Sequence, residues 1–310
     1  MRFRRRTPFL LSVAAAVAMI LPGPARAWGP NGHAYIATVA RDLLRGRNPA
    51  AAAQFDALLA NDSIALSGND SKTGRPAICH GRSLSEIASW PDCIRRLRQQ
   101  KATGAFHFDD VPLCGDVPPA PPPLPDYCNG GCATEALTRF VRELSDTRLS
   151  RPRRARALAW IIHIVGDLHQ PLHNVDNNED RGGNLVSISI AGDAFGTRRF
   201  SSDNLHSLWD TPMVFAAVGE GPGALASVRA LADQHLADWR ETDTRQWVVQ
   251  AHDIARMAYM TLPEPPVCPN GKAGGGRITR AYVASLADEV RAQLARGAIR
   301  LADVVEGALA

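Results

Sequence analysis

The sequence contains none of the short motifs that mark nucleotide-binding enzymes or serine hydrolases. It has no P-loop, no glycine-rich dinucleotide-binding pattern and no Gly-x-Ser-x-Gly turn, so nothing in it supports nucleotide-driven phosphoryl transfer, hydride transfer or an α/β-hydrolase fold. It also has no internal repeat, which argues against a solenoid or a propeller. No stretch resembles an interdomain linker, and we therefore expect residues 28–310 to form one domain.

Segments with the two-residue alternation of a β-strand are scarce. The clearest is 184–191, where Val186, Ile188 and Ile190 alternate with small polar residues, and we expect it to pair with 197–200 as a short β-hairpin. Apolar residues instead recur at intervals of three and four, which predicts a mainly α-helical fold. The predicted helices are 32–44, 50–59, 83–99, 134–145, 152–168, 205–218, 225–238, 243–260 and 279–309.

The apolar run at residues 9–21 is too short to span a membrane, which argues against an N-terminal anchor helix. It follows a cluster of arginines and precedes Ala25-Arg-Ala27, the small-residue ending of a cleavable secretory signal. We therefore expect residues 1–27 to be a signal peptide, the mature chain to begin at Trp28, and the protein to be secreted or periplasmic. The adjacent Arg5 and Arg6 leave a twin-arginine export route open.

The chain also lacks the excess of positive charge that is typical of broad nucleic-acid-binding surfaces. Its formal net charge of +4 includes five arginines within residues 1–27, a segment without any acidic residue, so residues 28–310 carry a formal charge of −1. An anionic substrate must then be recognised by a local site rather than by a general basic surface.

All six cysteines lie after the predicted signal: Cys79, Cys93, Cys114, Cys128, Cys132 and Cys268. An even number suits disulfide bonding in an oxidising compartment, although the count alone leaves the pairing open. The Cys128-x-x-x-Cys132 spacing also suits a metal site. We favour disulfides, because an exported chain with histidine and carboxylate ligands has less need of thiolates.

The sequence does contain two His-x-x-x-Asp pairs. His163 and Asp167 lie four residues apart in a predicted helix, and therefore on one face of it, and a turn then leads to His173. His206 and Asp210 repeat the spacing. One such pair is often only a hydrogen bond on a helix surface. Two pairs with an intervening histidine indicate a zinc site, since an imidazole and a carboxylate one turn apart can bind the same ion.

Further candidate ligands lie upstream of these pairs. Asp92 and His107 stand in strongly apolar or aromatic surroundings, and His33 follows the predicted mature terminus by five residues. A terminal amine has a pKa of about 7.7–8.0, so a metal ion can displace its proton near neutral pH. The amine and carbonyl of Trp28 therefore become a candidate chelate once the signal is removed.

These residues lie in motifs that together resemble the zinc-dependent single-strand-specific nucleases of fungi, plants and bacteria, which are related to the bacterial zinc phospholipases C. The resemblance runs from Trp28 to the end of the chain. Its most specific parts are Trp28-Gly-Pro-Asn-Gly-His33, Ile87-Ala-Ser-Trp-Pro-Asp92, His107-Phe108, His163-Ile-Val-Gly-Asp167-Leu-His-Gln-Pro-Leu-His173, Gly182-Gly-Asn184 and Asn204-Leu-His-Ser-Leu-Trp-Asp210.

The resemblance implies a single-domain helical fold of the zinc phospholipase C and single-strand nuclease type, with three zinc ions. It implies that Asp167 bridges two of them. The implied sets are Asp92, His107, His163 and Asp167 for one ion, Trp28, His33 and Asp167 for a second, and His173, His206 and Asp210 for a third. Three divalent ions carry more positive charge than three carboxylates carry negative charge. The site would therefore have the local positive charge that the chain as a whole lacks.

The resemblance also implies the reaction, in which a metal-activated water attacks phosphorus and leaves products with 5′ phosphates. Asp92 and Asp167 hold the metals, and Arg95 matches an arginine that contacts the phosphoryl oxygens, a role that suits its guanidinium fork. A solvated helix face beside Arg96 and Arg98 is the alternative for Arg95. The implied substrates are single-stranded DNA and RNA and nucleotides, with 3′-nucleotidase activity.

Three residues match positions that contact a nucleobase. Phe108 would stack on it and Asp110 would hydrogen-bond to it, and such stacking tolerates any base. The neighbouring Asp109 is an alternative to Asp110. Asn204 is a further candidate base contact that could equally cap the helix containing His206.

The resemblance also implies disulfides Cys128–Cys132 and Cys114–Cys268, which leaves Cys79 and Cys93 to each other. We expect the remaining histidines, His80, His169, His235 and His252, to stay outside the metal sites. The phase of His169 points it away from His163 and Asp167.

Two other functions remain. A zinc phospholipase C would use the same metals on a lipid headgroup, but its first histidine lies further from the terminal tryptophan than the short Trp-Gly-x-x-Gly-His spacing places His33 here. A secreted zinc-binding or adhesion module explains the cysteines but not so many ligands with open coordination. We therefore expect a soluble, monomeric nuclease without membrane attachment after signal removal.

Overall fold

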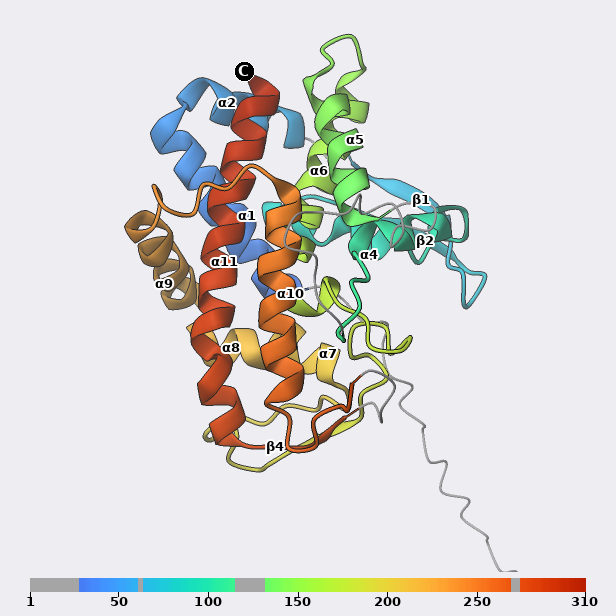
Figure 1. The fold of residues 1–310 in the computed structure, drawn as a ribbon. Helices are drawn as coiled ribbons and strands as arrows, with labels where there is room; N and C mark the ends of the chain where they lie inside the picture. The colour runs from blue at the N-terminus through green and yellow to red at the C-terminus, as the bar shows by residue number, and fades with distance from the viewer. Residues whose placement is uncertain (1–27, 61–63, 115–131, 269–273) are drawn as a thin grey trace, which may run out of the picture.

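The computed structural model describes residues 28–60, 64–114, 132–268 and 274–310. It confirms the predicted mainly α-helical fold (Figure 1). The long helices are α1 (Pro30–Arg47), α2 (Pro49–Leu59), α5 (Ala133–Ser145), α6 (Arg151–Leu168), α9 (Gly221–Gln234), α10 (Thr244–Met260) and α11 (Arg280–Leu309). None of the described helices combines the length and apolar character needed to cross a membrane. The predicted signal, residues 1–27, and the proline-rich segment 118–125 lie outside the described residues.

The core forms where α6 lies between the other long helices. Every residue of α6 from Ala157 to Leu168 is buried, as expected for a helix that is apolar almost all round. α1 packs along α11, and α5 packs along α6 (Figure 1). The polar residues His163 and Asp167 are therefore carried into the interior on a helix that is otherwise apolar, which requires partners for both.

Two predicted helices are interrupted in the structure. The segment predicted as 83–99 forms α3 (Leu84–Ala88), α4 (Trp90–Ile94) and the start of a 3₁₀ helix, η1 (Arg98–His107). Pro91 explains the break, because it lacks an N–H and lies in the first turn of the new helix. The segment predicted as 205–218 forms α7 (Leu205–Leu208), a π-helical turn η4 (Trp209–Met213) that contains Pro212, and α8 (Val214–Val218).

The predicted hairpin between 184–191 and 197–200 is wrong. The strand β3 (Ile188–Ile190) instead pairs in parallel with β4 (Gly276–Ile278). Gly275 allows this pairing, because its φ is 141° and an added Cβ would lie 2.5 Å from the Ser187 carbonyl oxygen. The segment does make an antiparallel contact, but at Asn204, which bridges Ser187, rather than at 197–200. A second antiparallel pair among the described residues joins β1 (Leu66–Asn69) and β2 (Pro76–Cys79).

Two disulfides lie among the described residues, Cys79–Cys93 and Cys114–Cys268. The Cys114–Cys268 bridge confirms a pair that the resemblance implies, and Cys79–Cys93 confirms the pair that was left by elimination, a departure from the fungal pattern. Cys132 is also disulfide-bonded, and its expected partner Cys128 lies outside the described residues. The first bridge closes 14 residues and the second closes 154. The long bridge ties the segment after η1 to the segment after α10.

We expect the long bridge to stabilise the fold more than the short one, because the loop entropy removed from the unfolded chain grows with loop length. Replacing Cys114 and Cys268 by serine should lower the free energy of unfolding by about 2–4 kcal/mol, measured by denaturant titration. The matched control replaces Cys79 and Cys93. Peptide mapping that joined Cys114 to any cysteine other than Cys268 would contradict the pairing.

Candidate metal centre

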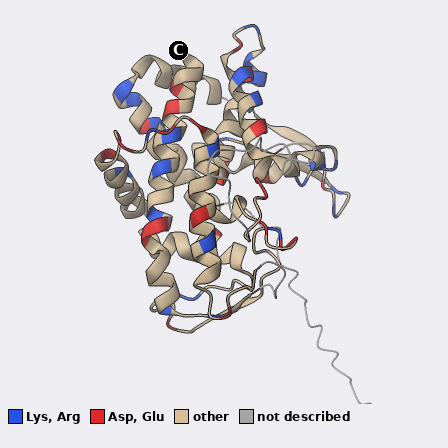
Figure 2. Ribbon diagram, viewed as in Figure 1, with Lys and Arg blue, Asp and Glu red and all other residues tan. Residues whose placement is uncertain are grey.

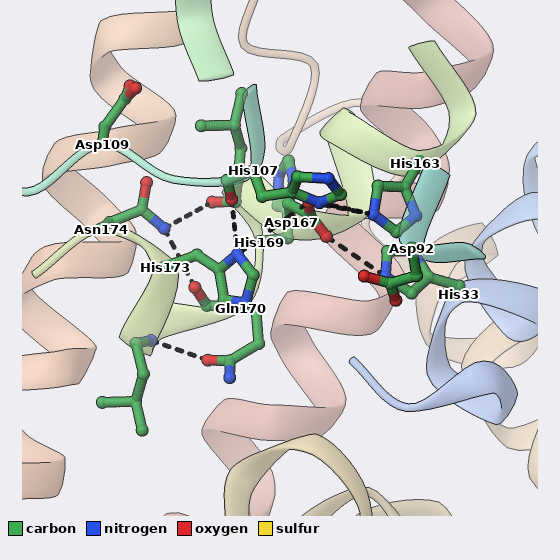
Figure 3. A network of polar contacts seen from close by, with 12 residues as sticks. His33, Asp92, His107, Asp109, His163, Asp167, His169, Gln170, His173 and Asn174 are labelled. Carbon is green, nitrogen blue, oxygen red and sulfur yellow. Dashed lines mark hydrogen bonds and ion pairs between the residues drawn. The ribbon is translucent and has the colours of Figure 1, made fainter. Parts of the chain in front are cut away.

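Asp167 stands at the centre of a cluster of buried histidines from three elements (Figure 3). Its Oδ2 lies 3.0 Å from His107 Nδ1 and 3.2 Å from His163 Nε2, and its Oδ1 lies 3.2 Å from His33 Nε2. His33 comes from α1, His107 ends η1, and His163 precedes Asp167 by one turn of α6. The approach of α1 depends on Gly166, since a Cβ there would lie 2.4 Å from His33 Nδ1.

Several polar atoms of this cluster have no hydrogen-bond partner. His33 Nε2 and Asp167 Oδ1 lack the geometry of a hydrogen bond despite their short separation, and His107 Nε2 is buried without any hydrogen-bond partner. Buried polar groups in this condition cost free energy. A metal ion held there would remove that cost, because metal ions bind imidazole nitrogens and carboxylate oxygens directly.

Asp92 completes a second group with His107 and His163. One ligand atom from each of these three residues lies within 4.8 Å of the others, and the same holds for His33, His163 and Asp167. Asp92 lies in the first turn of α4, and its Oδ1 is 3.1 Å from Arg95 Nη2. The two groups share His163, so two metal ions bound there would be close neighbours.

His173, His206 and Asp210 form a third buried group. The Nε2 atoms of His173 and His206 lie 3.1 Å apart. Both Nδ1 atoms contact backbone carbonyls, His107 O at 2.5 Å and Gly182 O at 2.7 Å, and must therefore be donors. In neutral imidazoles this leaves two lone pairs facing each other. A shared cation is the natural partner for such a pair, and carbonyls that fix the tautomer are typical of zinc sites.

A backbone carbonyl fixes the tautomer of His163 in the same way. Its Nδ1 lies 2.7 Å from the Ala88 carbonyl and must be the donor, which leaves the lone pair of Nε2 facing Asp167. Burial lowers the pKa of every histidine in the three groups, to about 4 for His206, so the rings stay neutral and able to bind metal. Burial raises the pKa of Asp167 to about 7 and that of Asp210 well above its usual value. Bound cations would reverse this effect, since they favour the carboxylate form.

Trp28 lies beside these groups. Its side chain is fully buried, and a Cβ on Gly32 would lie 2.8 Å from its Cβ. The Gly29 N–H donates to the Asp210 carbonyl at 2.6 Å, which ties the start of the described chain to the element that carries the third group. All nine predicted metal ligands are therefore buried, and eight of them belong to the three groups, Trp28 being the ninth.

Several supporting residues were not predicted from the sequence. Gln170 donates from Nε2 to Asp210 Oδ1 at 2.7 Å and accepts the Leu172 N–H through Oε1. Asp180 accepts the Gly183 N–H and the Tyr259 hydroxyl, the latter at 2.7 Å, and so stabilises the loop whose Gly182 carbonyl orients His206. Gln170 stands inside the quoted His-Gln-Pro-Leu-His motif, which could have indicated it. Tyr259 lies in none of the quoted motifs, so the sequence did not indicate its role.

The third group opens into a cavity of about 970 Å³. Its lining includes His173 and His206 together with all of the predicted substrate contacts, which are Arg95, Phe108, Asp110 and Asn204. Asn204 also accepts the Ser207 N–H at 2.8 Å and caps α7, so both of its predicted roles are compatible with its position.

Asp110 and Asp109 differ sharply in position. Asp110 lines the cavity, and burial together with the nearby Asp176 raises its pKa to about 6. Asp109 is only 1% exposed and its Oδ1 faces the Thr134 N–H at the start of α5. The structure therefore does not support Asp109 as a base contact.

The remaining histidines lie outside the three groups. His169 is fully buried, with Nδ1 2.7 Å from the Val165 carbonyl and Nε2 3.0 Å from Arg300 Nη1, so it faces α11 rather than the metal ligands. His252 contacts the Pro112 carbonyl, and His235 stacks on Trp239.

The chain is similar to known nucleases. The family described as S1/P1 Nuclease matches residues 28–310. Nuclease P1 of Penicillium citrinum is 28% identical over 89% of this chain and 96% of its own length. Nuclease PA3 of a Penicillium species is likewise 28% identical with the same coverage. Nuclease S1 of Aspergillus oryzae is 27% identical over 68% of this chain and 63% of its own length.

Proposed function

The chain belongs to the S1/P1 nuclease family, and on this basis we propose that it is an exported, zinc-dependent, single-strand-specific endonuclease. It hydrolyses phosphodiester bonds in single-stranded DNA and RNA, leaves 5′ phosphates, and also acts as a 3′-nucleotidase. It acts as a soluble monomer in the secreted or periplasmic space. The observation that carries the proposal is the set of three buried His/Asp groups beside a cavity lined by Arg95, Phe108 and Asp110.

We assign three zinc ions to this centre. The proposed ligands are Asp92, His107, His163 and Asp167 for the first ion, Trp28, His33 and Asp167 for the second, and His173, His206 and Asp210 for the third. Zinc held there would lower the pKa of an attacking water and offset the charge on the phosphate and the departing 3′ oxygen. The protein fixes the ligands in position through the carbonyls of Ala88, His107 and Gly182.

The residues of the cavity position the substrate. Arg95, held 3.1 Å from Asp92, directs its guanidinium fork toward the non-bridging oxygens of the scissile phosphate. Phe108, which is 37% exposed, offers a ring face for a nucleobase, and Asp110 accepts hydrogen bonds from the base edge. A base can reach Phe108 only when it leaves its stack, which a duplex resists and a flexible strand permits.

We therefore expect single-stranded DNA and RNA to be cut much faster than the corresponding duplexes. Phe108→Ala removes a stacking surface that is worth about 1–3 kcal/mol per base, so KM for single strands should rise by about 5-fold to 150-fold. The zinc content should not change, because Phe108 is not a ligand. Steady-state kinetics and metal analysis on the same preparations measure both quantities.

The same preparations distinguish the nearest alternative function, a zinc phospholipase C. Phosphatidylcholine should remain intact under conditions in which single-stranded DNA is digested. Rapid hydrolysis of phosphatidylcholine by the zinc-loaded protein, with no cleavage of either nucleic acid, would overturn the nuclease proposal and leave the metal ligands in place.

A further inference from the structure

One helical hairpin of the protein carries a dense group of positive charges. Residues 139–156, from the middle of α5 to the first turns of α6, contain seven arginines and two acidic residues, a formal charge of +5. Because residues 28–310 carry a formal charge of −1, the rest of that region carries −6. Figure 2 marks the Lys and Arg positions of this hairpin in blue on the ribbon. The low overall charge therefore conceals a local basic region.

Most of these arginines are not neutralised by a carboxylate. Among the described residues, Arg148 pairs with Asp146 at 2.8 Å and Arg153 pairs with Glu143 at 3.1 Å. The other five form no ion pair with a described carboxylate. We call them the arginine cluster, and they are Arg139, Arg142, Arg151, Arg154 and Arg156.

Some members of the cluster are held by neutral groups instead. Arg154 donates to the Leu144 carbonyl at 2.8 Å, and Arg151 donates to the Ala57 carbonyl. Arg139 lies over the rings of Phe106 and Phe140, with its guanidinium carbon 4.7 Å and 4.4 Å from their centroids. These contacts restrict the side chains but leave their positive charge available to an anion.

Two members of the cluster, Arg139 and Arg142, lie on α5, the helix whose first residue contacts Phe108 of the cavity lining. The Ala133 N–H, at the start of α5, donates to the Phe108 carbonyl at 3.2 Å. Phe106, under Arg139, precedes Phe108 by two residues. Arg139 and Arg142 are exposed and three residues apart, so they lie on one side of the helix. At 1.5 Å per residue, Arg139 lies about 9 Å from Ala133 along the axis of α5. The C-terminal end of α5 lies about 20 Å from Ala133 along the same axis.

We propose that the arginine cluster binds the phosphate backbone of single-stranded nucleic acid outside the cavity and so extends the binding site for long substrates. The inference rests on the proposed function. A strand that leaves Phe108 along α5 meets guanidinium groups, which bind phosphate through paired hydrogen bonds. An anionic membrane fits less well, since no large exposed apolar side chain among the described residues lies within 139–156 to insert into lipid.

The test compares a short and a long substrate on a triple variant, Arg139→Gln, Arg142→Gln and Arg156→Gln. A dinucleotide fills only the cavity, so its kcat and KM should not change. For a 20-nucleotide single strand, KM at low salt should rise about tenfold with kcat unchanged. The slope of log affinity against log salt should fall by about 2, as expected when three phosphate contacts to a single strand are lost.

The matched control, Arg45→Gln, Arg229→Gln and Arg240→Gln, makes the same change in net charge at arginines that are paired with carboxylates. It should leave both substrates unaffected. Equal effects of the cluster variant on both substrates, or no effect on the long one, would overturn the proposal. The proposal would also be overturned if the cluster variant lost binding to phosphatidylglycerol vesicles but kept an unchanged KM for the long strand.

Failure of the proposed function would appear separately. If the zinc-loaded wild-type protein cuts neither oligonucleotide, the nuclease proposal fails. Fluorescence anisotropy with the same 20-nucleotide strand still tests the cluster, since loss of binding in the triple variant supports it and unchanged binding contradicts it.

Discussion

Asp167→Asn should abolish most of the activity and lower the zinc content, the largest effect of any single substitution in the proposed centre. Asp167 faces His33 through one carboxylate oxygen, and His107 and His163 through the other. A neutral amide has the same shape but lacks the negative charge needed to bridge two cations. Loss of an outer-shell partner of a metal ligand already costs about 10–100-fold, so loss of this ligand should reduce kcat/KM by more than about 100-fold.

Asp109→Asn is the matched control, because Asp109 is also a buried carboxylate, yet it belongs to none of the three candidate metal groups. It should keep the wild-type zinc content. Metal analysis after dialysis, together with circular dichroism to show that both variants fold, makes the comparison. Equal and small losses of zinc in the two variants would mean that Asp167 does not bridge metal ions.

The helical part of the fold could be predicted because apolar periodicity reports directly which face of a helix is buried. α1, α5, α6 and α11 begin and end within a few residues of the predicted bounds. The break at Pro91 was missed because the apolar pattern continues through α3 and α4. Periodicity shows which residues are buried, and it does not show where the backbone hydrogen bonds stop.

The partner of β3 could not be predicted from local sequence. The alternation at Val186, Ile188 and Ile190 does indicate a strand, but β4 lies almost 90 residues further along the chain. Selection of that partner depends on Gly275, where any side chain would collide with Ser187. A close approach of this kind becomes visible only when the two segments are placed in space.

Part of the candidate metal centre could be predicted from residue type and spacing, whereas the contacts around it could not. His163 and Asp167 share a helix face by their spacing alone, whereas the bond between Tyr259 and Asp180 joins residues 79 positions apart. The arginine cluster shows a related limit. The net charge of residues 28–310 argues against a general basic surface, but a sum over the chain hides charges that a helical hairpin brings together.

A protein that retains a methionine before Trp28 should lose one of the three proposed zinc ions and most of its activity. The proposed ligand is the free amine of Trp28, and an amide nitrogen has no available lone pair with which to replace it. His33 and Asp167 alone would then remain for the second ion, fewer than the three protein ligands that are usual for a catalytic zinc. Metal analysis should therefore give about two zinc ions per chain.

The control is the same chain released from a cleavable leader so that Trp28 becomes the first residue, which should restore the second ion and full activity. The Trp28 side chain is fully buried in the structure, and the Gly29 N–H donates a hydrogen bond to the Asp210 carbonyl. Neither contact needs a free terminal amine, so the comparison isolates the effect of that amine. Both forms should therefore fold alike. Full metal content and full activity in the form that retains methionine would exclude the terminal amine as a ligand, and the second ion would need another partner near His33.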